Sequence, residues 1–348
     1  MGNKVFSSRR LPSPSNSGDL AAGMDRWTGV IHVALSRGGP SFRIAASLIL
    51  SATNKLAVPR ANAILFTGDR VRGTGDPTIE RLSDAAYLAR VLAGKLSGDT
   101  NAWVIDAARF AGPFAVYREL VPSVDAAGDP KGYDPTGFPA AAGIASILTH
   151  SIAEIQNKIS GRSSEDSSDN QHPTESWSSS RPPTTIILGF SKGGVVVNQL
   201  VTELSSWASE SVTNSIDVPG PSQSHLNNDL VPTSTTNVLS SISEYHYVDV
   251  GLNCAGAYIT DGEIIKEIAN HVLRTTSNLR FVLHGTPRQW SDPNRLWIRK
   301  EKDLMLQLLR DEAQRCEGRL VPSEKIYFDG RPRNLRMHFE ILEAMNIH

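Results

Sequence analysis

The residues whose types and spacing most clearly suggest chemistry surround Ser191, which lies between Gly189 and Gly193 in the order G-x-S-x-G. An apolar, β-branched run at 184–188 precedes the motif, and a helix-patterned run follows it. This is the layout of a nucleophile elbow, in which a serine occupies a sharp turn between a strand and a helix. Glycines two residues before and after it remove the Cβ atoms that would clash in so strained a turn. The pattern predicts that Ser191 is the nucleophile of an acyl transfer.

A nucleophilic serine needs a general base, and the base needs an acid that orients it. In the α/β-hydrolase arrangement these follow in the order serine, acid, histidine, each in the connection after a later strand. His338 follows the last expected strand, at 325–328, and Asp292 lies in the loop after the expected strand at 279–284. We therefore predict a triad of Ser191, Asp292 and His338.

These residues also have simpler interpretations. Asp292 precedes a proline and would suit the capping of a turn, so Asp249, near the end of the preceding expected strand, is the second candidate for the acid and Asp329 the third. His338 would alternatively cap a helix at the surface. His284, at a strand end, is expected to be a structural neighbour of the site and not its base.

Acyl transfer also requires an oxyanion hole, usually built from backbone N–H groups. One donor is expected to be Lys192, which follows the nucleophile, and the other Gly68 or Asp69 in the loop that reads F-T-G-D-R-V-R. That loop contains no H-G-G-G motif, and the alternative is a plain glycine-rich turn. Arg70 and Arg72 in the same loop are expected to be solvated, although they would alternatively recognise a substrate carboxylate or phosphate.

The composition and the remaining motifs exclude several classes of function. A net charge of −1 and a pI near 6.8 give no basic field, so nucleic acid is not an expected partner. No apolar run approaches the roughly 20 residues of a transmembrane helix. The spacing of a phosphate-binding G-x-x-x-x-G-K-[ST] loop and the paired cysteines and histidines of a zinc site are both absent, so we predict no metal and no cofactor. Two cysteines fit a reducing, intracellular compartment.

The elements that must position these residues alternate regularly along the chain. Strand-like and helix-patterned runs of this length predict a mostly parallel central sheet with helices on both faces, the α/β-hydrolase class. Strands are expected near 30–34, 63–67, 102–107, 184–188, 245–250, 279–284 and 325–328, and helices from 76, at 139–159, 192–208, 261–275 and 300–316.

We predict one domain, at 24–348, after a flexible leader at 1–23. Polar, serine-rich stretches near 161–183 and 209–241 are expected to be disordered insertions. The second follows the nucleophile helix, where hydrolases often carry a lid, but it is too polar to cover an apolar groove. The leader carries basic residues and serines before its first acid, a weak transit-peptide character.

Four blocks of sequence resemble the family named for human chromosome 2 open reading frame 69. They read F-T-G-D, G-F-S-K-G-G-V-V-V-N-Q-L, H-G-T-P-R-Q-W-S-D-P-N-R-L-W-I-R-K-E and H-F-E-I-L-E, and the likeness runs from Trp27 to the C-terminus. The resemblance implies an α/β-hydrolase-like protein related to esterases and lipases, with a mitochondrial location and the cytoplasm as the alternative. It also places Ser191, Asp292 and His338 on the family's triad.

The expected reaction is hydrolysis of an ester, thioester or amide through an acyl-enzyme, on a small or lipid-like acyl substrate. The alternative is a catalytically inactive protein that keeps the fold and acts by binding a partner, with mitochondrial maintenance as the expected role.

Overall fold

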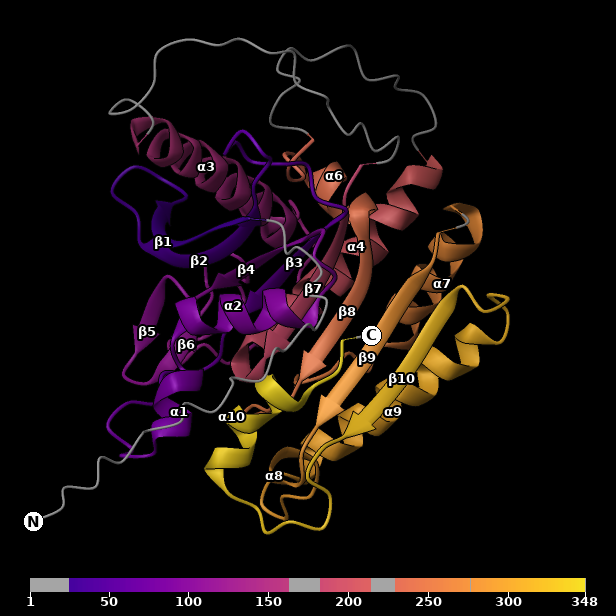
Figure 1. Ribbon diagram of the computed structural model, residues 1–348. Helices are drawn as coiled ribbons and strands as arrows, with labels where there is room; N and C mark the ends of the chain where they lie inside the picture. Colours follow the sequence, from indigo (N-terminus) through magenta and orange to yellow (C-terminus); the bar gives the residue numbers. More distant parts are fainter. Residues whose placement is uncertain (1–24, 163–181, 214–228, 276, 348) are drawn as a thin grey trace, which may run out of the picture.

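The computed structural model describes residues 25–162, 182–213, 229–275 and 277–347. An eight-stranded sheet forms its centre (Figure 1). Across the sheet the strands are β1 (Arg26–Ala34), β2 (Ser41–Ile49), β4 (Thr100–Ile105), β3 (Ala61–Phe66), β7 (Thr184–Phe190), β8 (Ile242–Val248), β9 (Leu279–Gly285) and β10 (Leu320–Ile326). Only β2 runs against the others, because it pairs antiparallel with both β1 and β4 whereas the remaining pairs are parallel. A short hairpin of β5 (Arg109–Ala111) and β6 (Phe114–Val116) lies apart from this sheet.

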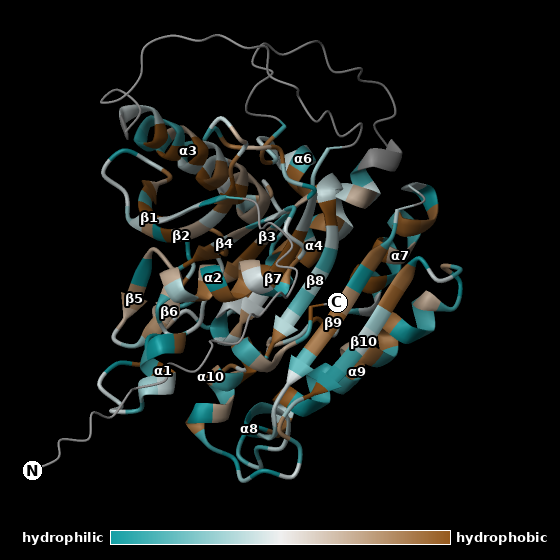
Figure 2. Cartoon of the chain, in the orientation of Figure 1, coloured by the Kyte–Doolittle hydropathy of each residue, from teal (hydrophilic) through white to brown (hydrophobic). Residues whose placement is uncertain are grey.

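Helices cover both faces of the sheet, and each face has its own apolar core (Figure 1). One face carries α3 (Pro139–Arg162), α4 (Gly194–Thr213), α6 (Thr235–Ser241), α7 (Gly262–Thr275) and α9 (Leu296–Ala313). The other carries α1 (Pro77–Leu82), α2 (Ala85–Lys95) and α10 (Leu335–Ala344). A single-turn helix, α8 (Pro287–Trp290), follows β9. Figure 2 shows the hydrophobic residues gathered on the strands and on the helix sides that face them.

This architecture confirms the predicted class, an α/β-hydrolase fold with a mostly parallel sheet and helices on both faces. The alternating pattern located most elements because buried parallel strands are continuous apolar runs. Three differences from the expectations need stating. The helix expected from residue 76 is two helices, which Ser83 and Asp84 separate, and the expected strands did not include β2. The stretch 209–241, expected to be an insertion, is helical at both ends in α4 and α6, while 214–228 and the leader 1–23 lie outside the described residues.

The N-terminus of α3 is held by a buried carboxylate from α4. The Oε1 and Oε2 atoms of Glu203 accept hydrogen bonds from the backbone N–H groups of Ala140 and Ala141, each at 2.8 Å. Gln199 Nε2 donates a third at 2.9 Å. Burial raises the pKa of Glu203 to about 7, against the lowering effect of these donors. Glu203 therefore satisfies helix-terminal N–H groups that no water reaches.

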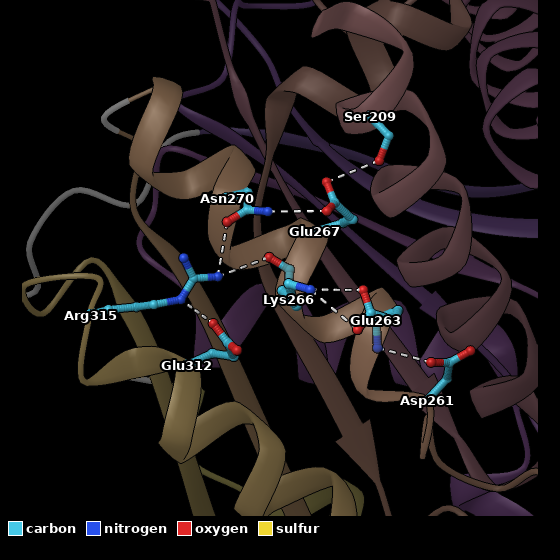
Figure 3. Close-up of polar contacts among 8 residues, drawn as sticks. All are labelled: Ser209, Asp261, Glu263, Lys266, Glu267, Asn270, Glu312 and Arg315. Atoms are coloured by element: carbon cyan, nitrogen blue, oxygen red, sulfur yellow. Dashed lines mark hydrogen bonds and ion pairs between the residues drawn. The ribbon is translucent and has the colours of Figure 1, made fainter.

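The outer face of α7 is fastened by polar contacts (Figure 3). Toward α4, Glu267 accepts a hydrogen bond from Ser209 Oγ at 3.0 Å. Toward the end of α9, Arg315 donates to Asn270 Oδ1 at 2.9 Å and to the carbonyl of Lys266 at 3.3 Å. Each of these contacts, at or near the surface, adds little stability. Together they hold α7 between α4 and α9.

We expect Glu203→Ala to lower the free energy of unfolding by about 2–4 kcal/mol, because it leaves buried N–H groups of α3 without an acceptor. Urea denaturation measures the change. Glu154→Ala, which removes an exposed ion pair to Lys158 on α3, is the control and should cost less than about 0.5 kcal/mol. Equal effects of the two substitutions would contradict this role of Glu203.

Candidate active site

The turn between β7 and α4 has the geometry of a nucleophile elbow. Ser191 has a φ of +54°, in the left-handed region that non-glycine residues rarely occupy. A Cβ atom on Gly193 would lie 2.2 Å from the carbonyl oxygen of Phe66, and one on Gly189 would lie 2.5 Å from Val197 Cγ2. A side chain at either position would therefore clash, with the backbone of Phe66 at Gly193 and with the Val197 side chain at Gly189.

His338 lies in α10, which places its side chain beside this turn. The helix is capped by Asn334, whose side chain accepts a hydrogen bond from the N–H of Met337 at 2.8 Å. The His338 ring stacks on Phe190, the residue before Ser191, with 4.6 Å between ring centroids. The side chain of His338 is only 8% exposed, so packing fixes its orientation.

The partner of His338 is Asp249, which was the second candidate for the acid. His338 Nδ1 lies 2.7 Å from Asp249 Oδ2. Asp249 follows β8, has a φ of +45° and is completely buried. Its carboxylate also accepts hydrogen bonds from Thr286 N at 2.7 Å and from Thr286 Oγ1 at 3.0 Å. With a carboxylate oxygen as its neighbour, Nδ1 is the nitrogen of His338 that donates the hydrogen bond, which leaves the Nε2 lone pair without a partner in this pair.

Asp292, predicted to be the acid, does not contact His338. Its carboxylate binds Arg295 Nε at 2.9 Å and Arg333 Nη1 at 3.2 Å. Burial alone would raise the pKa of Asp292, but hydrogen bonds from the backbone and from Arg295 hold it below its usual value. Asp292 is the wrong residue for the acid, because its loop turns it toward two arginines. The third candidate, Asp329, is exposed and accepts a hydrogen bond from the N–H of Gly330.

No hydrogen bond joins Ser191 to His338 in the part of the chain that the structure describes, and His338 Nε2 likewise has no hydrogen-bond partner there. Such bonds are often long without substrate and tighten when it binds. The stacking of His338 on Phe190 nevertheless places the Asp249–His338 pair next to the elbow, and Nε2 of His338 has no hydrogen-bond partner among the described residues.

His284 belongs to a different network. Its Nε2 lies 3.0 Å from His246 Nδ1, and its Nδ1 lies 3.0 Å from the hydroxyl of Tyr327. His246 Nε2 in turn lies 2.9 Å from Glu244 Oε2. Burial, and secondarily the neighbouring His246, lower the pKa of His284 to about 2, so its ring is neutral. The expectation that it is a structural neighbour agrees with these contacts.

The predicted oxyanion donors lie around Ser191. A Cβ atom on Gly68 would be 2.4 Å from Ser191 Cβ and 2.9 Å from its Oγ, so this loop touches the nucleophile. The backbone N–H groups of Gly68 and Asp69 donate to no acceptor among the residues that the structure describes. The N–H of Lys192 lies in the first helical turn, where backbone donors have no acceptor within the helix. All three remain available to a substrate oxygen.

The Lys192 side chain braces the loops around the turn. It is 2% exposed, and its Nζ lies 2.9 Å from the carbonyl oxygen of Ala127 and 3.1 Å from Asp129 Oδ1. A longer contact of 4.0 Å reaches Asp69 Oδ1, and Asp69 also accepts a hydrogen bond from the N–H of Ala115 at 2.8 Å. Burial raises the pKa of Asp69, and Lys192 opposes that shift. One ammonium group thus ties the elbow to the loop that would supply the second oxyanion donor.

Sequence reasoning missed the roles of Thr286 and Phe190. Thr286 follows β9 within H-G-T-P, and Phe190 is the variable residue before the serine. The position of each at the end of a strand was the only feature of the sequence that pointed to it.

Across the described ranges no cluster of His, Cys, Asp or Glu could hold a metal ion, and no helix is long and apolar enough to cross a membrane.

Comparison with known proteins finds a match between residues 141–314, half of the chain, and the model of the C2orf69 family. The mitochondrial protein C2orf69 homolog of Mus musculus is 26% identical over 159 residues, which cover 45% of this chain and 34% of that protein. Human mitochondrial protein C2orf69 is 26% identical, with 45% and 32% covered. The matched part thus spans about a third of the length of these relatives.

Among solved structures, siderophore hydrolase EstA from Aspergillus nidulans has a TM-score of 0.41 at 16% identity, with 97% of each chain covered. An S-formylglutathione hydrolase from Agrobacterium tumefaciens has a TM-score of 0.40 at 9% identity, with 92% of each covered.

The Asp249–His338 hydrogen bond should give a low-field imidazole N–H resonance in the proton NMR spectrum. We expect Asp249→Asn to abolish or strongly shift this signal, because the carboxylate that accepts the bond is lost. Asp292→Asn should leave it in place. A signal that responds to Asp292 and not to Asp249 would show that the acid has been misassigned.

Gly68→Ala should slow the reaction of Ser191 with a fluorophosphonate by at least tenfold, because the added methyl group meets the serine side chain. The measurement is the rate of covalent labelling in folded protein. Gly94→Ala is the control, since a Cβ atom there meets nothing within 4 Å, and it should label at the wild-type rate. Equal rates for all three proteins would contradict the contact.

Proposed function

This chain belongs to the C2orf69 family, and from that premise and the geometry of its elbow we propose that it is a serine hydrolase. The substrate is an ester or thioester, and the class includes the lipid-like esters that lipases cleave. The bond is broken through an acyl-enzyme on Ser191. The observation that carries the proposal is the 2.7 Å contact between His338 and Asp249 beside a serine in strained backbone. The order Ser191, Asp249, His338 along the chain is that of the α/β-hydrolase triad.

The first half of the reaction forms the acyl-enzyme. Ser191 Oγ attacks the carbonyl carbon while His338 Nε2 takes the hydroxyl proton, and Asp249 stabilises the resulting imidazolium. The carbonyl oxygen becomes an oxyanion that accepts hydrogen bonds from the N–H of Lys192 and from that of Gly68 or Asp69. Collapse of the tetrahedral intermediate breaks the bond to the alcohol or thiol, which leaves with the proton from His338.

The second half restores the enzyme. Water attacks the acyl carbon, gives its proton to His338 Nε2, and releases the acid as the proton returns to Ser191 Oγ. No residue other than those around the elbow is needed for either half. Because the matched relatives are named mitochondrial proteins, we also propose a mitochondrial location, which imaging of the tagged full-length chain would test.

We expect a fluorophosphonate to label the wild-type chain on the peptide that contains Ser191, and Ser191→Ala to lose that label completely. Ser240→Ala, which alters an exposed serine of α6, is the control and should label normally. Circular dichroism and thermal unfolding establish that each variant is folded. Absence of Ser191-dependent labelling in folded wild-type protein would reject the hydrolase and favour the catalytically inactive binding protein.

A further inference from the structure

A cavity of about 390 Å³ lies beside the proposed nucleophile, and apart from Gly68 and Asp69 its lining plays no part in the bond-breaking steps above. Two of its lining residues are next to Ser191, namely Gly68 in the loop after β3 and Phe190 at the end of β7. Gly68 approaches the Ser191 side chain closely enough to exclude a methyl group, and Phe190 immediately precedes the serine. A substrate whose carbonyl lies at Ser191 therefore has this cavity directly beside it. Three arginines, Arg43, Arg70 and Arg72, line it, and we call it the arginine pocket.

Arg70 is held in place without using its hydrogen-bonding capacity. Its guanidinium carbon lies 3.6 Å from the ring centroid of Phe110, a cation–π stack. Its nearest acidic neighbour, Asp106 Oδ2, is 4.0 Å away, and its guanidinium donates no hydrogen bond to any residue in the described ranges. Burial lowers the pKa of Arg70, although the group stays cationic at neutral pH. Its planar fork of donors is thus oriented and unused.

The carboxylate near Arg70 is already engaged by other groups. Asp106 accepts a hydrogen bond from Thr67 Oγ1 at 2.9 Å and another from Arg43 Nη1 at 3.2 Å. A second nitrogen of Arg43 faces Asp84 at 3.7 Å, but Asp84 also caps α2 by accepting from the N–H of Tyr87. These two carboxylates already bind other groups of the pocket wall, so the guanidinium of Arg70 keeps its hydrogen-bond donors free.

The remaining charges of the lining are distributed unevenly. Asp69 is engaged with Ala115 and Lys192 on the side of the elbow. Glu80 is exposed in the first turn of α1, and Arg72, also exposed, makes no ion pair within the described part of the chain. The exposed part of the lining therefore carries Glu80, Asp84 and Arg72, and the half-buried Arg70 carries an unused guanidinium.

We propose that the arginine pocket binds a carboxylate or phosphate group on the substrate, with Arg70 as the residue that recognises it. A guanidinium fork matches either anion with two parallel hydrogen bonds, and a partly buried site strengthens them. The enzyme would then act on acyl groups that end in an anion. This inference rests on the proposed function for its location relative to the scissile bond, but the anion site itself is a property of the pocket.

The first experiment compares esters that differ only at the far end of the acyl group. The 4-nitrophenyl esters of butanoic acid, succinic acid and 3-phosphonopropanoic acid supply a neutral, a carboxylate and a phosphonate end, and the glutaryl and adipyl esters vary the reach. We expect Arg70→Gln to lower kcat/KM for the preferred anionic ester about 10- to 100-fold and to leave the butanoyl ester within about twofold. Which anionic ester is preferred distinguishes the carboxylate from the phosphate.

Arg109→Gln is the matched control. Arg109 lies beside Phe110 in the same hairpin, but it is exposed, pairs with Glu119 at 2.9 Å and does not line the pocket. Its substitution should leave the ratio of anionic to neutral turnover unchanged. Equal losses on neutral and anionic esters in Arg70→Gln, or equal effects of the two arginine substitutions, would overturn the proposal.

A second experiment separates this inference from the hydrolase proposal. Succinate and inorganic phosphate are titrated into Ser191→Ala protein, with and without Arg70→Gln, and binding is followed by calorimetry. Binding that requires Arg70 supports the anion site even if Ser191 is never labelled. If neither probe binds and no anionic ester is preferred, the pocket has no such role, whether or not Ser191 is a nucleophile.

Discussion

The close contact between the end of β3 and the turn after β7 is the constraint on which the rest of the site depends. Side-chain atoms are excluded at Gly193 by the carbonyl of Phe66, at Gly189 by Val197 and at Gly68 by Ser191 itself. This crowding holds Ser191 in its left-handed conformation, which would relax in a looser turn. The same contact brings the unpaired N–H groups of two separate segments to one point. The proposed nucleophile and the proposed oxyanion donors are therefore brought together by one packing arrangement.

His338 is held beside the elbow because α10 is bound to α1 and α2, which lie at least 240 residues earlier in the chain. Tyr87 Oη donates to Glu343 Oε1 at 2.6 Å, Arg81 binds the same carboxylate at 2.8 Å, and Lys95 donates to the carbonyl of Met345 at 3.0 Å. These contacts fix α10 against α1 and α2, and with it the ring of His338 over the elbow. Several modest interactions thus combine to hold one imidazole in place.

The two candidate acids show how local sequence and tertiary contacts can disagree. Asp292 occupies the expected loop, yet it is drawn to Arg333, 41 residues further along the chain, as well as to nearby Arg295. Asp249 contacts His338 because it follows β8, the strand next to β7, and because Thr286 in the connection after β9 binds its carboxylate. His338 lies 46 residues after Asp292 and 89 residues after Asp249. The spacing in a single sequence does not reveal which of these two carboxylates it contacts, because the paths of the loops after β8 and β9 decide that.

The sequence by itself was enough to predict the alternating architecture, the glycine-flanked turn at Ser191 and the position of His338 after the last strand. Apolar β-branched runs and a glycine-flanked serine are local patterns, and they dictate local structure directly. Tertiary structure alone decided that Asp249 is the partner of His338, that β2 is a reversed strand, and that Arg70 stacks on Phe110 with its donors unused. Each of these three features is a contact between residues far apart in the sequence or between neighbouring strands. Packing across the sheet and competition among charged groups decide such contacts, and the spacing of residues along the chain does not reveal them.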